Sequence, residues 1–289
     1  MITFAGKLRL IKMMNTERLN PLNDYLFLKY MGEKGDEVQL LAFLNAVLHR
    51  TGRNNLQSLE IIENRTLSAE IIGDKTSILD VRAKFDDGTK VNIEVQLSNL
   101  GNMDKRSLFY WSRDFSKSLE AGHDYLELPA VININIVNFE FLPVDDFHAS
   151  FHLWEDQNHE YMLTDALEIH FIDMIKFKRL QKKDITNNPL HRWLTFFDKN
   201  ANNKTIKEVI NMDTAIQKAH ERIAFVAKDK ESLRAYEMRE MALSDFTSGM
   251  NFARREGIIE VAKNMKKAGV DAHQIMIFTN LSENDIGKL

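Results

Sequence analysis

Two runs of alternating apolar and polar residues, separated by a short turn, constrain the fold of this chain more than any other feature. The first run spans residues 77–85 and the second spans residues 90–98. Apolar residues, many of them β-branched, occupy every second position of each run, which is the pattern of a half-buried β-strand. The intervening Asp86-Asp87-Gly88 is typical of a hairpin turn. The sequence therefore predicts a β-hairpin with one apolar face and one polar face.

The length of the turn determines which polar residues face one another across the hairpin. Residues directly opposite in an antiparallel pair lie on the same side of the sheet. A two-residue loop would set Asp80 opposite Val95 and so mix the two faces. A three-residue loop, residues 86–88, sets Asp80 opposite Glu94 and puts Gly88 where such a loop needs a left-handed residue. We therefore predict the three-residue loop, with the two carboxyl side chains roughly 5 Å apart between their Cβ atoms.

The predicted register also brings two lysines together near the turn. Lys84 faces Lys90 across the hairpin, and like charges directly opposite one another destabilise a sheet. Such a pair is tolerable only if it is exposed near the turn.

The predicted acid pair suits a divalent cation. Two carboxylates held that close repel one another unless they share a proton or a cation. Oxygen ligands suit hard ions, and Mg²⁺ is typically held by one or two carboxylates together with substrate phosphates. Alternation alone favours a simpler interpretation, in which Asp80 and Glu94 belong to an exposed face of the sheet.

The residues around the acid pair resemble a known family. Asp80, followed on the next strand by Glu94-Val95-Gln96, looks like the Asp…(Asp/Glu)-x-Lys core of the PD-(D/E)xK nuclease superfamily. A wider ordered set resembles the PD-(D/E)xK nuclease family transposases, the recombination-promoting nucleases: Asp74-Lys75, Leu79-Asp80-Val81, Asp86 and Gly88, Asn92–Gln96, and Arg106, Tyr110 and Arg113. The similarity extends upstream to residues 23–29 and downstream to the C-terminal tail, and it covers most of the chain.

This resemblance implies an α/β fold with a restriction-endonuclease-like core, in which helices flank a mixed central sheet, plus a helical C-terminal extension. We expect a leader over residues 1–16, a nuclease-like domain over residues 17–235, and a helical, helix-turn-helix-like extension over residues 236–289. Within the C-terminal region, apolar spacing predicts separate helices over residues 231–243 and 251–268.

The resemblance further implies a metal-dependent DNA endonuclease of a transposase or recombination-promoting type. Asp80, Glu94 and the Val95 carbonyl would hold Mg²⁺ or Mn²⁺, and the ion would activate a water to attack phosphorus. In the resembled family the segment around residues 20–30 supplies an acidic residue near the metal, which makes Asp24 a further candidate ligand. The alternative for Asp24 is a first-turn aspartate favoured by the helix dipole.

Gln96 stands where the superfamily usually has lysine, although recombination-promoting members often carry glutamine there. Glutamine cannot supply a positive charge, so either Gln96 orients the water by hydrogen bonding or another lysine takes the role. Lys75, which precedes the Asp80 strand, is the candidate for a displaced lysine. Its alternative is an ordinary solvated loop lysine.

The helix predicted over residues 104–119 has two distinct faces. Its predicted buried stripe contains Leu108, Trp111, Phe115 and Leu119. Its basic face, at positions i, i+4, i+7 and i+11, contains Arg106, Tyr110, Arg113 and Lys117. A basic face with an aromatic residue inside it suits contacts with DNA phosphates, because arginine offers a bidentate fork. A solvated amphipathic helix is the alternative.

Composition limits the remaining classes of function. The 289 residues include no cysteine, which excludes a disulfide framework and a thiolate metal site and fits a reducing cytoplasm. No apolar run is long enough to span a membrane. The net charge of −4 argues against non-specific coating of DNA, but local basic clusters still allow a DNA partner. The oligomeric state, including a homodimer, stays open.

Two histidines in predicted strands are interpreted as structural. His152 and His170 alternate with apolar residues, so we expect each on the polar face of its strand. The chain lacks the histidine and cysteine spacing that zinc sites require.

Two rival functions come from other classes. A degenerate nuclease fold would bind DNA or a protein partner without cutting; Gln96 and the mild net charge favour it, and the intact pair of Asp80 and Glu94 opposes it. Alternatively, the helical tail would make the chain a protein-interaction module.

Overall fold

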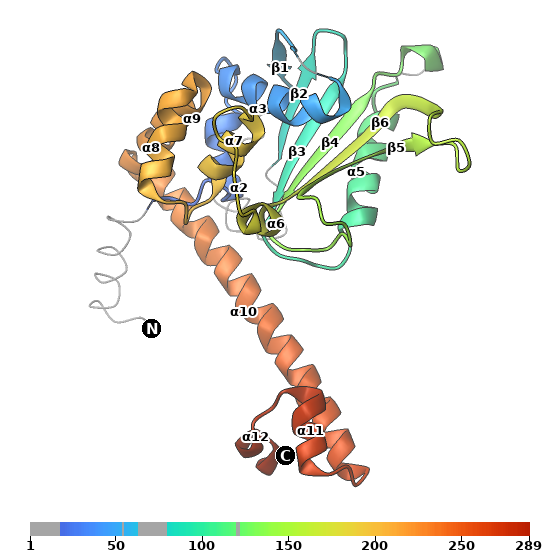
Figure 1. Ribbon diagram of the computed structural model, residues 1–289, viewed down its shortest axis with the longest axis vertical. Coiled ribbons are helices and arrows are strands. Elements are labelled where there is room, and N and C mark those ends of the chain that lie inside the picture. Colours follow the sequence, from blue (N-terminus) through green and yellow to red (C-terminus); the bar gives the residue numbers. More distant parts are fainter. Residues whose placement is uncertain (1–17, 54, 63–79, 120–121) are drawn as a thin grey trace. The chain divides into compact units, whose positions relative to one another are not determined.

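The computed structural model divides the chain into two compact units, residues 1–237 and 238–289, each described by itself below. The structure describes residues 18–53, 55–62, 80–119 and 122–289 (Figure 1). The predicted leader and the candidate Lys75 lie outside the described residues.

A mixed β-sheet forms the centre of the first unit (Figure 1). Within the described residues it has six strands in the order β1-β2-β3-β4-β6-β5. The strands are β1 (Leu59–Ile61), β2 (Val81–Phe85), β3 (Lys90–Gln96), β4 (Val131–Val137), β5 (His148–Trp154) and β6 (Met162–Asp173). Strands β3, β4 and β6 run parallel, whereas β1, β2 and β5 are antiparallel to their neighbours. The predicted α/β fold with a mixed central sheet is confirmed.

The β2–β3 hairpin has the predicted register. Lys84 pairs with Lys90 across the turn, and Gly88 adopts the left-handed conformation with φ +88°. The pairing extends to the residue next to Asp80, and one further step along the same ladder sets Asp80 opposite Glu94. The three-residue loop is therefore confirmed, and both carboxyl side chains belong to the same side of the sheet.

A group of helices lies beside the sheet, and α2 of this group packs against β3 (Figure 1). The helices are α2 (Asp24–Met31), α3 (Val38–Leu48), η1 (His49–Thr51), α6 (Met174–Arg179), α7 (Pro189–Phe197), α8 (Asn203–Met212) and α9 (Thr214–Lys228). Aromatic rings from α2, α3 and α7 meet edge to face: Phe27, Tyr30, Phe43, Trp193, Phe196 and Phe197. Large rings that bury this much area dominate a core, so they fix the helical layer against the sheet.

Helix α5 (Met103–Ser116) covers the opposite face of the sheet, and the short η2 (Tyr125–Glu127) follows it. Ser107 of α5 is buried; its hydroxyl donates to the Asn135 side-chain oxygen at 2.9 Å, and its carbonyl accepts from Asn133 at 3.0 Å. The prediction that Leu108 is buried is wrong, since this side chain is 49% exposed. The hydrogen bonds of Ser107 with Asn133 and Asn135 place this side of α5 against the sheet, so Leu108 faces away from the sheet.

The face of β6 opposite α5 carries a buried chain of polar groups. Thr51 donates to Glu168 at 2.5 Å, and the His170 ring bonds both Glu168 at 2.8 Å and His148 at 2.9 Å. His170 lies on the same side of β6 as the polar Glu168, as the alternation predicts, but this side is buried within the protein and His170 is fully buried. His152, at the edge of the same cluster, keeps a side chain that is 13% exposed.

The second unit contains most of helix α10 (Lys230–Lys267), followed by α11 (Ala272–Thr279) and α12 (Glu283–Gly287). Its core is small and consists of Ala262, Ile275 and Ile286. The prediction of two separate helices over residues 231–243 and 251–268 is wrong, because α10 is continuous. The linking residues contain no proline and one glycine, which costs only about 1 kcal/mol inside a helix.

Candidate active site

The acid pair lies between the sheet and helix α5, and a guanidinium holds each carboxylate. Arg82 Nε is 2.8 Å from Asp80 Oδ2, and Arg106 contacts Glu94 through a terminal nitrogen. The Asp80 and Glu94 side chains are only 10% and 5% exposed. The simpler interpretation, an exposed sheet face, is therefore wrong for these two residues. They form a nearly buried, charge-balanced group of two acids and two arginines.

The surroundings of Glu94 disfavour its ionised form. Burial raises the pKa of the Glu94 carboxyl, and the neighbouring Asp80 charge raises it further, while Arg106 and Arg82 oppose this shift. The net direction is upward, so the two guanidiniums do not fully stabilise the Glu94 carboxylate. A carboxylate in this condition gains from an additional positive charge close to it.

Gln96 and Val95 occupy the positions that the hairpin register predicts. Gln96 lies on the same face as Glu94, at the end of β3, and its amide donates to the Ser98 carbonyl at 3.2 Å. Val95 alternates to the opposite face, where its side chain is buried. The Gln96 side chain therefore lies on the same side of the sheet as Glu94, two residues along the strand. It offers hydrogen bonds but no charge.

Asp24 is buried at the start of α2. Its Oδ1 accepts a hydrogen bond from the Tyr25 N–H at 2.9 Å, as expected of a first-turn aspartate. Across the described residues, no three or more His, Asp or Glu side chains gather in a metal-binding arrangement. In the structure, Asp24 therefore does not complete a three-acid set with the pair.

The basic face of α5 is assembled around one aromatic ring. The guanidinium carbons of Arg106 and Arg113 lie 5.6 Å and 5.0 Å from the centre of the Tyr110 ring, on its two neighbouring turns. The Nε atoms of both arginines are buried and have no hydrogen-bond partner within the described part of the chain. Lys117, one turn further, is exposed. The predicted grouping therefore exists, with Arg106 turned towards Glu94.

Sequence reasoning missed two charged residues of the site. Arg82 bonds Asp80 and also lies 3.7 Å from Asp114 of α5, so it links the hairpin to the helix. The available signal was the spacing, because Arg82 is two residues from Asp80 and hence on the same face of the strand. The partner Asp114 depends on how α5 docks, which the sequence pattern did not show.

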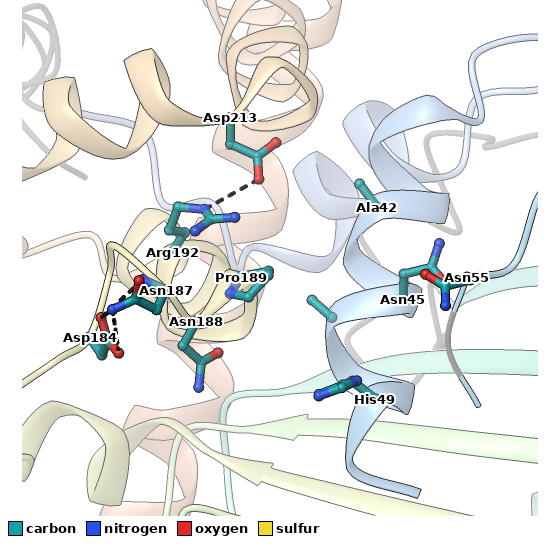
Figure 2. Close-up of a pocket in the computed structure, with 11 residues that line it drawn as sticks. Ala42, Asn45, His49, Asn55, Asp184, Asn187, Asn188, Pro189, Arg192 and Asp213 are labelled. Carbon is teal, nitrogen blue, oxygen red and sulfur yellow. Dashed lines mark hydrogen bonds and ion pairs between the residues drawn. The ribbon is translucent and has the colours of Figure 1, made fainter. Parts of the chain in front are cut away.

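A cavity of about 790 Å³ opens elsewhere, between α3 and the segments that begin α7 and α9 (Figure 2). Its polar lining is bonded to neighbouring residues. Arg192 lies 3.4 Å from Asp213, Asp184 accepts from the Asn187 amide at 3.3 Å, and Asn188 caps α7. None of the acid-pair residues lines it. The cavity therefore adds no candidate chemistry to that of the acid pair.

Comparison of the sequence with models of known protein families shows which family the chain belongs to. A family model described as PD-(D/E)XK nuclease family transposase matches residues 21–253. The chain belongs to this family. The predicted resemblance is confirmed, and membership in the PD-(D/E)XK nuclease family transposases supports a role of nuclease or transposase type. The match includes the acid pair and α5 and extends into α10.

Neither the curated proteins nor the solved structures give a match to this chain. In the part of the chain that the structure describes, every helix is too short or too polar to cross a bilayer.

Proposed function

We propose that this protein is a metal-dependent DNA endonuclease that hydrolyses phosphodiester bonds in a transposition or recombination process. The observation that carries the proposal is the register of the β2–β3 hairpin, which sets Asp80 and Glu94 on one face. Family membership supports the assignment of that pair to phosphodiester chemistry.

The residues of the pair fit a hard divalent cation such as Mg²⁺ or Mn²⁺. Carboxylate oxygens are the ligands such ions prefer, and Mg²⁺ commonly takes one or two of them together with water and substrate phosphate. The raised pKa of Glu94, to which Asp80 contributes, is the electrostatic sign of a site that favours added positive charge. When bound, the ion would supply a nucleophilic water at neutral pH and stabilise the charge that develops on the phosphate.

Arg106 has two successive roles in this proposal. In the structure its guanidinium neutralises Glu94. A cation at the acid pair would take over that neutralisation, and Arg106 would then be available to the scissile phosphate, to which arginine binds through two parallel hydrogen bonds. Tyr110 keeps the guanidinium close by, since Arg106 and Arg113 both lie against its ring.

The remaining candidates act on the water and the DNA backbone. Gln96 would orient the attacking water through its side-chain amide, with Lys75 as the alternative source of a positive charge. Arg113 and Lys117 would hold the DNA backbone beside the site, because arginine and lysine are the main residues that contact phosphate oxygens. Val95 would offer its carbonyl as a further ligand, and Asp24 is the alternative acid.

A plasmid-nicking assay tests the proposal. Wild-type protein is expected to nick supercoiled plasmid with Mg²⁺ and to lose this activity in EDTA. Asp80→Ala should lower the nicking rate by at least about 100-fold, as expected when a metal ligand is removed. Asp156→Ala removes an exposed acid from the loop between β5 and β6 and should retain the rate. Absence of Mg²⁺-dependent nicking by pure wild-type protein contradicts the proposal.

A catalytically degenerate nuclease fold is the second candidate. The observation that favours it is the low exposure of the acid pair, with both carboxylates already bonded to arginines. Such a protein would retard DNA in a gel in the presence of Mg²⁺ without cutting it, equally in wild type and Asp80→Ala. Loss of that retardation even at low salt would favour a protein-interaction module instead.

A further inference from the structure

A second group of cations surrounds a small cavity on the acid-pair face of the sheet. The cavity has a volume of about 170 Å³ and lies where the start of β3 meets the last turn of α5. Its charged lining residues are Arg82, Lys90, Lys117 and Asp114. Asp80 also pairs with Arg82, so three cations face two acids, which leaves a net positive charge beside the cavity.

Lys90, one of the cations beside the cavity, is also close to a second lysine. Lys84 and Lys90 are paired directly across the hairpin, and like charges in that position repel one another. Lys90 Nζ donates to the Ser118 hydroxyl at 2.9 Å, a neutral partner, and no carboxylate of the described residues forms an ion pair with it. Arg82 is the cation with acidic neighbours, Asp80 and Asp114. Glu60 of β1 is paired with Lys84 on its other side, whereas an anion in the cavity would lie beside Lys90 and Lys117 and offset their charge.

A buried amide faces the same cavity. Asn92 lies two residues before Glu94 on the same strand face, is 5% exposed and lines the cavity. Its Oδ1 has no hydrogen-bond partner in the described part of the chain. A buried polar atom without a partner costs free energy and calls for a ligand. The oxygen itself accepts hydrogen bonds and disfavours an anion, but rotation of the amide by 180° places the Nδ2 donor in its position, and that donor would bind an anion.

We propose that this cavity binds a backbone phosphate of DNA, flanking the phosphate that lies at the acid pair. The inference rests on the proposed DNA substrate. Four residues along β3 separate Lys90 from Glu94, a distance of about 13 Å at 3.3 Å per residue. Phosphates of one strand advance by about 3.4 Å along the helix axis of DNA, so the two sites are a few nucleotides apart.

Salt dependence of DNA binding tests this site without any cleavage. The variant Lys90→Gln/Lys117→Gln and the wild type are titrated onto a short fluorescent duplex in EDTA, between about 50 and 200 mM salt. Loss of one phosphate contact should reduce the slope of log K against log salt by about 1. The matched control Lys204→Gln/Lys207→Gln removes two exposed lysines from α8 and should leave the slope unchanged.

Two further experiments test whether the positive charge of the lysines is sufficient, and whether the site prefers DNA to free phosphate. Lys90→Arg/Lys117→Arg keeps both charges and should restore the wild-type slope. Inorganic phosphate, compared with chloride at equal ionic strength, should compete with DNA only weakly, because the site is one contact of an extended backbone. Thermal unfolding of each variant checks the fold, and removal of Lys90 should not lower the melting temperature since it relieves repulsion with Lys84.

A slope of the Lys90→Gln/Lys117→Gln variant equal to that of the α8 control overturns the proposal. So does a wild type that does not bind the duplex in EDTA, or inorganic phosphate that stabilises wild type but not the variant while the DNA slope is unchanged. These outcomes are independent of cleavage. A protein that binds DNA with the expected slopes but does not nick plasmid contradicts the proposed endonuclease and leaves this phosphate site standing.

Discussion

Glu94 is the residue on which the proposed chemistry most depends. It is nearly buried, it lies beside Asp80, and its carboxylate is bonded to Arg106. Burial and Asp80 raise its pKa, so its proton is lost at a higher pH than that of an exposed glutamate. Since a cation binds only the ionised carboxylate, affinity for Mn²⁺ should fall on acidification at a higher pH than for an ordinary glutamate site.

Arg106→Ala makes this dependence measurable. Removing the guanidinium removes the strongest stabilisation of the Glu94 anion, so the pKa of Glu94 should rise further. The pH midpoint of Mn²⁺ binding, followed by calorimetry, should therefore move upward relative to wild type. Lys105→Ala, an exposed neighbour on α5, should leave the midpoint in place. A midpoint in Arg106→Ala that is unchanged or lower contradicts the assigned role.

At this scale the sequence predicted the acid pair but not its partners. The pairing of Asp80 with Glu94 follows from a period of two and one glycine turn, both local and readable. The contact between Arg106 and Glu94 depends on which side of α5 meets the sheet. Buried hydrogen bonds of Ser107 decide that orientation, and the apolar pattern alone indicated a different one.

The β2–β3 hairpin is the element that positions the acid pair. Gly88 has φ +88°, and a side chain added there would meet open space. Gly88→Ala should therefore destabilise the fold through backbone strain alone, by about 1 to 2 kcal/mol in urea unfolding. Gly88→Asn should cost less, because asparagine tolerates the left-handed conformation. Equal stability of the alanine variant and wild type would contradict the three-residue turn.

The buried chain on β5 and β6 makes a prediction about acid. His170 Nε2 lies 2.8 Å from Glu168 Oε1, and His170 Nδ1 lies 2.9 Å from His148 Nε2. His148 is buried, which disfavours its charged form. Burial, together with His170 and Arg50, lowers the pKa of His148 to about 3. The unfolded chain takes up this proton near pH 6.5, so stability should fall as the pH drops from there towards 3.

His148→Gln tests that assignment, since glutamine can donate but does not titrate. One proton fewer is taken up on unfolding, which should reduce the loss of stability below pH 6.5 by up to about 1.4 kcal/mol per pH unit. Urea midpoints at neutral pH and near pH 5 give the comparison. The pKa of Glu168 is lowered from 4.5 to about 2, so the stability that this carboxylate contributes is lost mainly below pH 4.5, outside the range compared here. An equally steep decline in the variant contradicts a neutral His148.

At the scale of the whole molecule, the sheet and both helical layers belong to the first unit, which ends after Glu237. Tyr236 is buried there, and its hydroxyl accepts the Asn20 N–H at 3.0 Å. A chain ending after Glu237 should therefore unfold cooperatively, within a few degrees of the full-length transition of this unit. A chain ending at Ala235 should melt lower. Loss of cooperative unfolding in the longer truncation contradicts an independent first unit.

The alternating pattern predicted the hairpin, and the family resemblance implied the α/β fold with a mixed sheet. The continuity of α10 was not predictable from the sequence. A glycine within a polar stretch suggests the end of a helix, although glycine destabilises a helix only slightly. Likewise, the buried histidine chain looked like a polar strand face, since a sequence does not show that Thr51 will supply the missing hydrogen bond.

The central claim is that Asp80 and Glu94 together hold a divalent cation, and Mn²⁺ binding measured by electron paramagnetic resonance tests it most directly. Wild-type protein at slightly alkaline pH should bind Mn²⁺, and both Asp80→Asn and Glu94→Gln should weaken binding by at least about tenfold. Asp156→Asn should bind as wild type does. A wild type that binds no Mn²⁺, or carboxamide variants that bind it equally well, would contradict the account.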